Sequence, residues 1–324
     1  MSIKGVNVCV YGLNRSLEVT IHSIKKKILD NVQNFADETH FYAAFNITKS
    51  GQFWTKRSGE GLSSIGTDQQ HLLTNFEIEL VDQDDFDAGF NLADALAFGD
   101  HYQDSGGSIL NMTRALNALQ KCFKKIPLYA RRSFPTIFIR PDLDIIDEID
   151  IEFLLHQCIS DSVVVPGWQF FGGVNDRFAI ASAGLASETY ANRLDTIFQH
   201  LTLTNRPFHS EQYLFDILAL RKIRVLPIVQ TRFVRIRSGK VLHPEKTQHE
   251  NIQHPCAAAS WTLLTEQLMT TRRRLREGDE KIENLKETQS NLEHKILELE
   301  SSLYRNKQKV RKLRSRVKAL NNNN

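Results

Sequence analysis

The sequence has few cysteines and lacks the long apolar segments of secreted and membrane proteins. Its four cysteines are far apart and form no Cys-x-x-Cys pair, which fits reduced, mostly buried thiols better than a disulfide framework or a zinc site. No uninterrupted apolar run approaches the length of a membrane span, and residues 1–5 enter a strand without the apolar core of a signal peptide. We therefore expect a soluble, cytoplasmic protein with no transmembrane segment.

The usual nucleotide-binding fingerprints are also missing. Residues 6–13 predict a strand that breaks at Gly12, and a helix with apolar residues at Leu17, Ile21, Ile24 and Ile28 follows, with Ser16 as a possible cap. A second strand is expected over residues 39–45. This succession predicts a Rossmann-like βαβ unit. Its turn has no Gly-x-Gly-x-x-Gly sequence, and the chain has no Walker lysine motif, so neither fingerprint identifies a nucleotide.

Residues 1–242 are expected to form one α/β domain. Apolar residues make up 41% and charged residues 24% of the chain, which are ordinary globular values. A long loop is expected over residues 49–70. The remaining predicted strands cover residues 76–81, 136–139, 163–166, 223–228 and 232–236, and the remaining predicted helices cover 109–125, 183–200 and 210–220.

The C-terminal part has a different pattern. Residues 243–260 read as a polar linker, residues 261–320 carry heptads typical of a coiled coil, and residues 321–324 form a disordered tail. The heptad pattern is regular after Gly278-Asp279, so the continuous coiled coil is expected to begin there. This pattern predicts a homo-oligomer held by the coiled coil. A run of basic residues over 305–318 could bind nucleic acid or an anionic membrane surface, although a solvated helix face is the simpler interpretation.

The stretch from Thr136 to Asp147 organises the predicted domain. Residues 136–139 predict a strand buried on both faces, and Pro141 ends it and places Asp142 and Asp144 at its carboxyl edge. In open α/β sheets ligands bind at that edge. The two carboxylates could hold Mn²⁺ or Mg²⁺. Alternatively, Asp142 pairs with Arg140, and Asp144 or Asp147 caps the next helix.

Two later segments carry further candidates. Asn175 and Asp176 follow two glycines, so they either contact a sugar or form a tight turn. His209 and Glu211 stand where a helix begins, with Ser210 as a plausible N-cap. Glu211 could act as a general base and His209 as a phosphate ligand, although capping already explains this segment.

Three arginines, Arg15, Arg114 and Arg140, are candidates for binding phosphate through the guanidinium fork. Arg15 is the best placed, directly after the first glycine turn. Each of them has an alternative as an ion-paired or surface arginine.

Together these residues resemble a family of glycosyltransferase-like proteins associated with surface polysaccharide synthesis. The resemblance covers roughly residues 5 to 240. It is carried by Gly12-Leu13-Asn14-Arg15-Ser16, Asp82-Gln83, Phe86-Asp87, Asn111-x-x-Arg114, Arg140-Pro141-Asp142-Leu143, Gly172 to Ala179 and His209-Ser210-Glu211.

The resemblance implies a GT-A-like fold, a nucleotide-sugar donor and a glycan or other hydroxyl acceptor. It implies donor binding by Arg15, Arg114, Arg140 and His209, a metal at Asp142 and Asp144, and sugar or acceptor contacts from Asn175 and Trp168. Glu211 or Asp176 would deprotonate the acceptor in an inverting enzyme. A metal or arginines would stabilise the leaving group. Arg-Pro-Asp-Leu-Asp departs from the apolar run with Asp-x-Asp that is usual in such proteins.

Two other functions remain open at this point. The first is a non-catalytic, transferase-like scaffold whose basic coiled coil mediates oligomerisation or binds a polyanionic partner. The second is a glycoside hydrolase, for which nothing in the sequence positions the required pair of carboxylates.

Overall fold

The computed structural model describes residues 3–14, 16–49, 52–55, 60–64, 68–228, 231–237, 240–241, 281–293, 295–296, 299 and 307. The chain divides into two units, residues 1–266 and 267–324. Arg15, the predicted linker and most of the predicted coiled coil lie outside the described residues. The disordered tail predicted over residues 321–324 also lies outside them.

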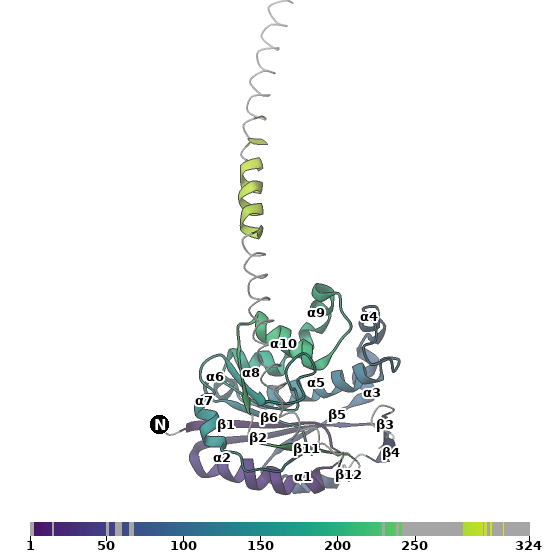
Figure 1. Ribbon diagram of the computed structural model, residues 1–324, viewed down its shortest axis with the longest axis vertical. Coiled ribbons are helices and arrows are strands. Elements are labelled where there is room, and N and C mark those ends of the chain that lie inside the picture. The colour runs from purple at the N-terminus through teal and green to yellow at the C-terminus, as the bar shows by residue number, and fades with distance from the viewer. Residues whose placement is uncertain are drawn as a thin grey trace, which may run out of the picture. The chain divides into compact units, whose positions relative to one another are not determined.

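A seven-stranded mixed sheet forms the centre of the first unit (Figure 1). Its order is β10 (Arg224–Ile228), β8 (Ser162–Pro166), β9 (Phe178–Ala181), β6 (Thr136–Ile139), β1 (Ile3–Leu13), β2 (Ala36–Ile47) and β5 (Glu77–Asp82). Only β9 runs antiparallel to its neighbours in this sheet. The order runs outward from β1 in both directions, which creates a switch point between β1 and β6, where open α/β sheets bind ligands. The predicted Rossmann-like α/β domain is confirmed, and its sheet is mixed.

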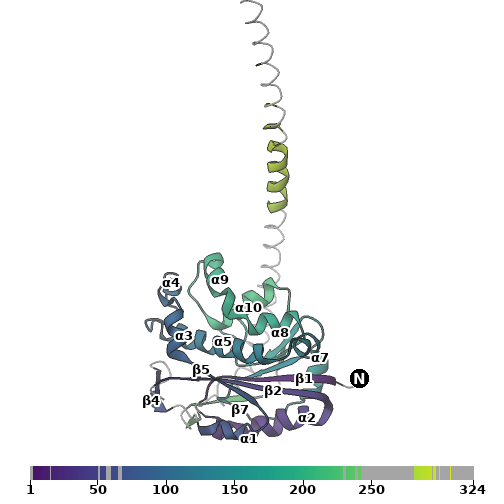
Figure 2. The same ribbon diagram turned by 180° about the vertical axis from the view of Figure 1, so that it is seen from behind.

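Helices cover both faces of this sheet (Figures 1 and 2). One face carries α1 (Leu17–Ile24), a π-helical turn (Lys25–Leu29) and α2 (Asp30–Phe35). The other face carries α5 (Gly107–Lys125), α6 (Leu128–Ser133), α8 (Leu185–Ala191) and α10 (Ser210–Leu220). Helices α3 (Gln83–Gly89) and α4 (Leu92–Leu96) follow β5 in the chain, and α7 (Ile151–Gln157) precedes β8.

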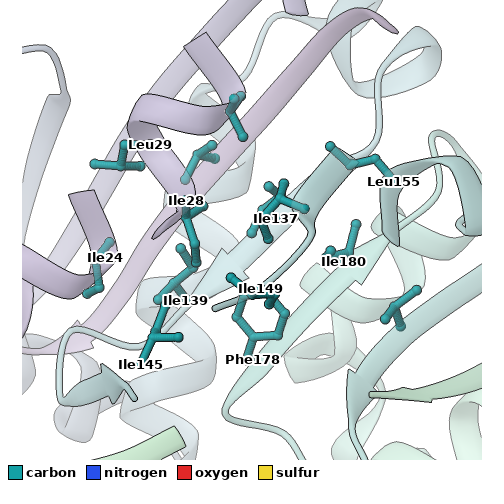
Figure 3. Packing of buried hydrophobic residues seen from close by; sticks show 14 of the residues in the cluster. Ile24, Ile28, Leu29, Ile137, Ile139, Ile145, Ile149, Leu155, Phe178 and Ile180 are labelled. Atoms are coloured by element: carbon teal, nitrogen blue, oxygen red, sulfur yellow. The ribbon is translucent and has the colours of Figure 1, made fainter. Parts of the chain in front are cut away.

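Strand β6 is buried on both faces, as its continuous apolar sequence predicts. Ile137 and Ile139 belong to the core cluster that β6 shares with α1, the π-helical turn and β9 (Figure 3). Phe138 points to the opposite face, where its ring centroid lies 6.0 Å from that of Phe123 in α5 and 4.8 Å from that of Tyr190 in α8. The carboxyl end of β6 is therefore held from both sides.

A small second sheet follows β6. Strand β7 (Leu143–Ile145) pairs antiparallel with β11 (Phe233–Arg237), which in turn pairs with β12 (Lys240–Val241). The register places Arg235 opposite Leu143 and Val234 opposite Asp144. Because side chains alternate along a strand, Arg235 and Asp144 project from opposite faces of this sheet.

Two predicted elements were wrong. The loop expected over residues 49–70 contains a hairpin of β3 (Gln52–Thr55) and β4 (Glu60–Ser64), followed by a 3-10 turn (Asp68–Leu72). The single helix expected over residues 183–200 is instead α8, a 3-10 turn (Arg193–Thr196) and α9 (Ile197–Thr204). The break comes at Asn192, whose backbone (φ −93°, ψ 16°) leaves the α-helical region.

Residues 281–293 of the second unit are helical, in agreement with the helix predicted there. Their apolar heptad residues Ile282, Leu285 and Leu292 are exposed in this single chain. Self-association of this helix therefore stays a prediction. Among the described residues, no helix combines the length and the apolar character needed to cross a bilayer.

Candidate functional site

A cavity of about 740 Å³ opens at the carboxyl ends of β1 and β6. This is the edge of the sheet at which the sequence predicts a ligand site. Five arginines and three carboxylates line it, together with aromatic side chains. The charged lining residues are Arg114, Arg140, Arg177, Arg193, Arg235, Asp104, Asp176 and Glu211, and the rings come from Tyr11, His101, Tyr102, Phe171 and His209.

Arg140 and Arg235 reach the cavity from a shared carboxylate, Asp142. Arg140 donates through Nε to Asp142 Oδ1 and through Nη2 to Oδ2, both at 3.1 Å. Arg235 donates through Nε to Asp142 Oδ2, also at 3.1 Å. Asp142 is 1% exposed and lies behind the two arginines rather than in the cavity lining. Burial acts against the charge of Arg140, but the carboxylates of Asp142 and Asp176 hold the pKa of its guanidinium above the ordinary value.

The turn that carries Arg140 and Asp142 is fixed from three sides. The Thr20 hydroxyl in α1 donates to the Pro141 carbonyl at 2.6 Å, and the Ile236 amide in β11 donates to the Asp142 carbonyl at 2.9 Å. The Arg140 amide donates to the Arg177 carbonyl at 3.3 Å, which joins the turn to the start of β9. The position of Asp142 is thus set by elements of both sheets.

Asp176 lies on the cavity wall among positive charges. Burial raises the pKa of this carboxyl, but Arg177, Arg140, the Ser210 hydroxyl and Arg193 together bring it below the ordinary value. Its backbone carbonyl accepts hydrogen bonds from the hydroxyls of Tyr11 (3.1 Å) and Tyr190 (3.2 Å). Asp176 is therefore a fixed anion at neutral pH.

Arg193 is a buried arginine that forms no ion pair with a carboxylate of the described residues. It is 3% exposed, its guanidinium stacks over the Tyr190 ring at 4.2 Å, and Nη1 donates to the Tyr190 carbonyl. Among the described residues no carboxylate forms an ion pair with it, and it lines the cavity. Burial lowers the pKa of this guanidinium, but Tyr190, Tyr11 and Asp176 raise it above the ordinary value, so Arg193 keeps its charge.

The start of α10 forms another wall. The predicted cap at Ser210 was wrong by one residue: His209 is the N-cap and accepts from the Gln212 amide through Nδ1 at 3.4 Å, whereas the Ser210 hydroxyl donates to Asp176. Glu211 lies 3.9 Å from Arg177 Nη2 and 3.8 Å from His209 Nδ1. The His209 ring stacks on Tyr102 with centroids 5.7 Å apart.

The glycines before Asn175 bring this wall into place. Gly172 adopts a φ of +80°, which a residue with a side chain rarely does. Gly173 lies so close to α10 that a Cβ there would meet the Glu211 carbonyl at 2.0 Å. The Val174 amide donates to that same carbonyl at 2.8 Å.

Of three further predicted site residues, Arg114 lines the cavity, whereas Asn175 and Trp168 are buried outside it. Arg114 lines the cavity and is bound by Asp87, which accepts from its Nε at 2.9 Å and from its Nη2. Asn175 is fully buried and forms the turn, since its Nδ2 donates to the Trp168 carbonyl at 2.9 Å. Trp168 is 3% exposed and packs against Phe233, with ring centroids 6.3 Å apart. Neither of these last two lines the cavity.

The carboxylates after β6 are dispersed. Asp144 projects from the face of the small sheet opposite to Arg235 and is not in the cavity lining. Asp147 accepts from Arg232 through both oxygens, and Asp150 rather than either earlier aspartate caps α7. Within the described ranges, no group of three or more His, Cys, Asp or Glu side chains is arranged to hold a metal ion.

Arg193 and Arg235 are absent from the sequence-based candidates. Arg193 falls inside the stretch that predicts one continuous helix, so nothing marks it as turned inward. Arg235 does leave a signal, because it interrupts the apolar run Phe233-Val234-Arg235-Ile236.

No protein-family model and no curated protein sequence matches the chain. Among solved structures, the apo form of mouse xyloside xylosyltransferase 1 is similar with a TM-score of 0.37 and 12% identity, over 70% of this chain and 85% of that one. The galactosyltransferase LgtC, in complex with donor and acceptor sugar analogues, is similar with a TM-score of 0.37 and 10% identity, over 69% and 72% of the two chains. The mixed seven-stranded sheet agrees with the α/β class expected from the sequence.

Proposed function

We propose that the chain transfers a glycosyl group from a nucleoside-diphosphate sugar to a hydroxyl of a glycan acceptor. The observation that carries this proposal is Arg193. A buried charge without an ionic partner is costly unless a ligand supplies one. Because the guanidinium lines a cavity beside four other arginines, the fitting ligand is an anion with several oxygens.

The cavity also suits the rest of such a donor. Its volume of about 740 Å³ lies within the range of roughly 300–1,000 Å³ found for small-molecule sites. Rings at its wall, including Tyr102 and His209, offer flat surfaces for a base or a sugar. The motifs around Arg140, Asp176 and Glu211, which resemble those of glycosyltransferase-like proteins, all reach this one cavity.

In the proposed reaction the bond between the anomeric carbon and the diphosphate oxygen breaks, and a bond from the acceptor oxygen to that carbon forms. The nucleoside diphosphate leaves with the electron pair, and fixed positive groups stabilise the charge that develops on it. The proton of the acceptor hydroxyl passes to a carboxylate in the inverting case. Glu211 suits this role better than Asp176, because the lowered pKa of Asp176 makes it a weak base.

Calorimetry of the full chain with UDP-, GDP- and CMP-sugars, each with and without Mn²⁺, tests the proposal. We expect a UDP- or GDP-sugar to bind, with transfer or slow hydrolysis of that donor, whereas CMP-sugars, which carry a single phosphate, should not bind. Absence of binding to every member of the panel would overturn it and would leave a non-catalytic scaffold as the alternative.

Variants of Arg193 connect the binding to this cavity. A charged hydrogen bond contributes about 1.5–3 kcal/mol, so Arg193→Gln should weaken donor binding roughly 10- to 100-fold. Arg193→Lys keeps the charge but loses the guanidinium fork, so its affinity for the donor should lie between that of the parent and that of Arg193→Gln. Arg132→Gln, at an exposed arginine of α6 outside the cavity, is the control and should bind as the parent does.

A further inference from the structure

Asp142 holds two arginines at the place where the sequence suggested a metal ligand. Its oxygens already accept three bonds from Arg140 and Arg235, each of 3.1 Å. A Mg²⁺ ion needs carboxylate oxygens at about 2.0–2.1 Å and a near-octahedral shell of oxygen ligands. Two guanidinium groups beside the same carboxylate would repel such a cation and occupy its approach from the cavity.

The second expected ligand lies elsewhere. Asp144 pairs in register with Val234, so it projects from the face of the small sheet opposite to Arg235 and the cavity. In the part of the chain that the structure describes, no alternative cluster of His, Cys, Asp and Glu replaces it. The residues after β6 therefore do not fit a divalent metal site.

We propose that Arg140 and Arg235, aligned by Asp142, bind the diphosphate of the donor in the role that a metal ion would otherwise have. This inference rests on the proposed function, because that function supplies the diphosphate. Both guanidinium groups line the cavity, whereas the carboxylate between them does not. Guanidinium forks match pairs of phosphate oxygens and keep their charge at any working pH.

The geometry of the pair favours binding over a merely structural role. Arg140 uses Nε and Nη2 on Asp142, which leaves Nη1 without a protein partner among the described residues. Asp142 is itself held through its backbone by Ile236, and the preceding Pro141 is held by Thr20. Because these supports are already in place, little ordering is needed when the anion arrives.

Asp142 is a positioning residue in this arrangement, since it contacts the arginines and does not line the cavity. Arg235 comes from β11, and it supplies the second fork from a strand distant in sequence from the turn after β6. The small sheet of β7 and β11 therefore has a binding role as well as a structural one.

Metal dependence is the first test. The full chain is titrated with UDP, GDP and inorganic diphosphate by calorimetry, once in EDTA and once with Mn²⁺. We expect the same affinity in both buffers. Binding that appears only with Mn²⁺ would overturn the inference and would leave the proposed function standing.

Variants of the second arginine provide the next test. Arg235→Gln should weaken binding of the diphosphate roughly 10- to 100-fold, as the loss of a charged hydrogen bond predicts. The matched control is Arg232→Gln, three residues earlier in the chain, which breaks a comparable pair with Asp147 outside the cavity. It should lower stability and leave the diphosphate affinity unchanged. Equal losses in the two variants would contradict the proposal.

Asp142→Asn tests the positioning role. A structural collapse would weaken nucleoside and nucleoside diphosphate alike, whereas misaligned arginines would weaken only the diphosphate. We therefore expect uridine or guanosine to bind Asp142→Asn as it binds the parent, with a selective loss for UDP or GDP. An unchanged affinity for the diphosphate would refute the role of Asp142.

The inorganic diphosphate arm separates the two proposals. If no nucleotide sugar binds but inorganic diphosphate binds in EDTA and loses affinity in Arg235→Gln, the proposed function fails and the arginine pair stands. If nucleotide sugars bind and Arg235→Gln changes nothing, the arginine pair fails and the proposed function stands.

Discussion

Replacing Gly173 with alanine is expected to displace the start of α10 and to disable the cavity. The added Cβ would lie 2.0 Å from the carbonyl carbon and oxygen of Glu211 and 2.3 Å from the Gln212 amide nitrogen. All three atoms belong to the backbone, so no side-chain rotation relieves the contact. To reach an ordinary separation near 3.4 Å, the two segments must move apart by about 1.4 Å.

The structure indicates the size of the effect. Overpacking of this kind costs about 1–3 kcal/mol, and loss of the bond from Val174 to Glu211 adds about 1 kcal/mol. A sum of about 2–4 kcal/mol corresponds to a fall in Tm of roughly 5–10 °C for a domain of this size. The shift also moves Glu211, and a misplacement of about 1 Å can reduce catalysis on the order of 100-fold.

Thermal unfolding and donor calorimetry on three glycine variants separate the effect of the backbone clash from that of backbone strain. Gly172→Ala adds a side chain at a φ of +80° with nothing within 4 Å, so it should cost only about 1–2 kcal/mol of backbone strain. Gly89→Ala, at the end of α3 with nothing within 4 Å, should be neutral or slightly stabilising. Gly173→Ala should be the worst of the three in both assays.

A Gly173→Ala protein with the Tm and the donor affinity of the parent would refute this reasoning. Such a result would show that α10 moves at little cost, and hence that the position of Glu211 is not fixed by this contact. A loss of stability without any loss of donor binding or transfer would separate packing from the site and would exclude Glu211 from the reaction.

Three further predictions concern other parts of the chain. Hydrogen bonds from Arg232 lower the pKa of Asp147 in the folded protein. The stability that this carboxylate contributes is therefore present above its unfolded pKa and is lost as the pH falls through its folded pKa. In urea unfolding, Asp147→Asn should be less stable than the parent at neutral pH, and this difference in stability should shrink below about pH 4. Lys27→Met removes a buried ammonium that donates to three consecutive carbonyls, starting at Ile145, and should cost about 1–3 kcal/mol, whereas Lys26→Met at the exposed neighbour should cost little. We propose that the helix over residues 281–293 self-associates, in which case Leu285→Asp lowers the mass seen by light scattering, and an unchanged oligomer would contradict it.

Strands with continuous apolar sequences could be predicted well, since burial on both faces leaves a local signature. Residues 136–139 are one example, and their sequence predicts β6 with its bounds. The sequence also places a cavity at the correct edge of the sheet, because the carboxyl ends of parallel strands share that edge. Arg140, Asp176 and Glu211 all line this cavity, while their roles stay predictions.

The failures come from interactions that no short stretch encodes. Arg193 turns inward because the helix breaks at Asn192. Its stacking on Tyr190 is local, but its backbone carbonyl accepts a hydrogen bond from the Tyr213 hydroxyl, 20 residues away. The partner of Asp142 across the small sheet, Arg235, is 93 residues away. For Asn175 the sequence left a turn and a sugar contact open, and the structure shows the turn, because its side chain bonds to the Trp168 carbonyl and the Arg177 amide.

For three of the five cavity arginines, the order of charges explains why ion pairing does not cancel their attraction for an anion. Arg114 is paired with Asp87, and Arg140 and Arg235 are paired with Asp142, yet in each case the arginine lines the cavity and the carboxylate does not. An anion in the cavity is therefore closer to the arginine than to the carboxylate of each pair, so its attraction to the arginine exceeds its repulsion from the carboxylate. The carboxylates behind them fix the direction of the forks, as oriented dipoles do in a preorganised site. Removing such a carboxylate adds net positive charge but loses that direction, and so Asp142→Asn should weaken diphosphate binding even though it makes the cavity more basic.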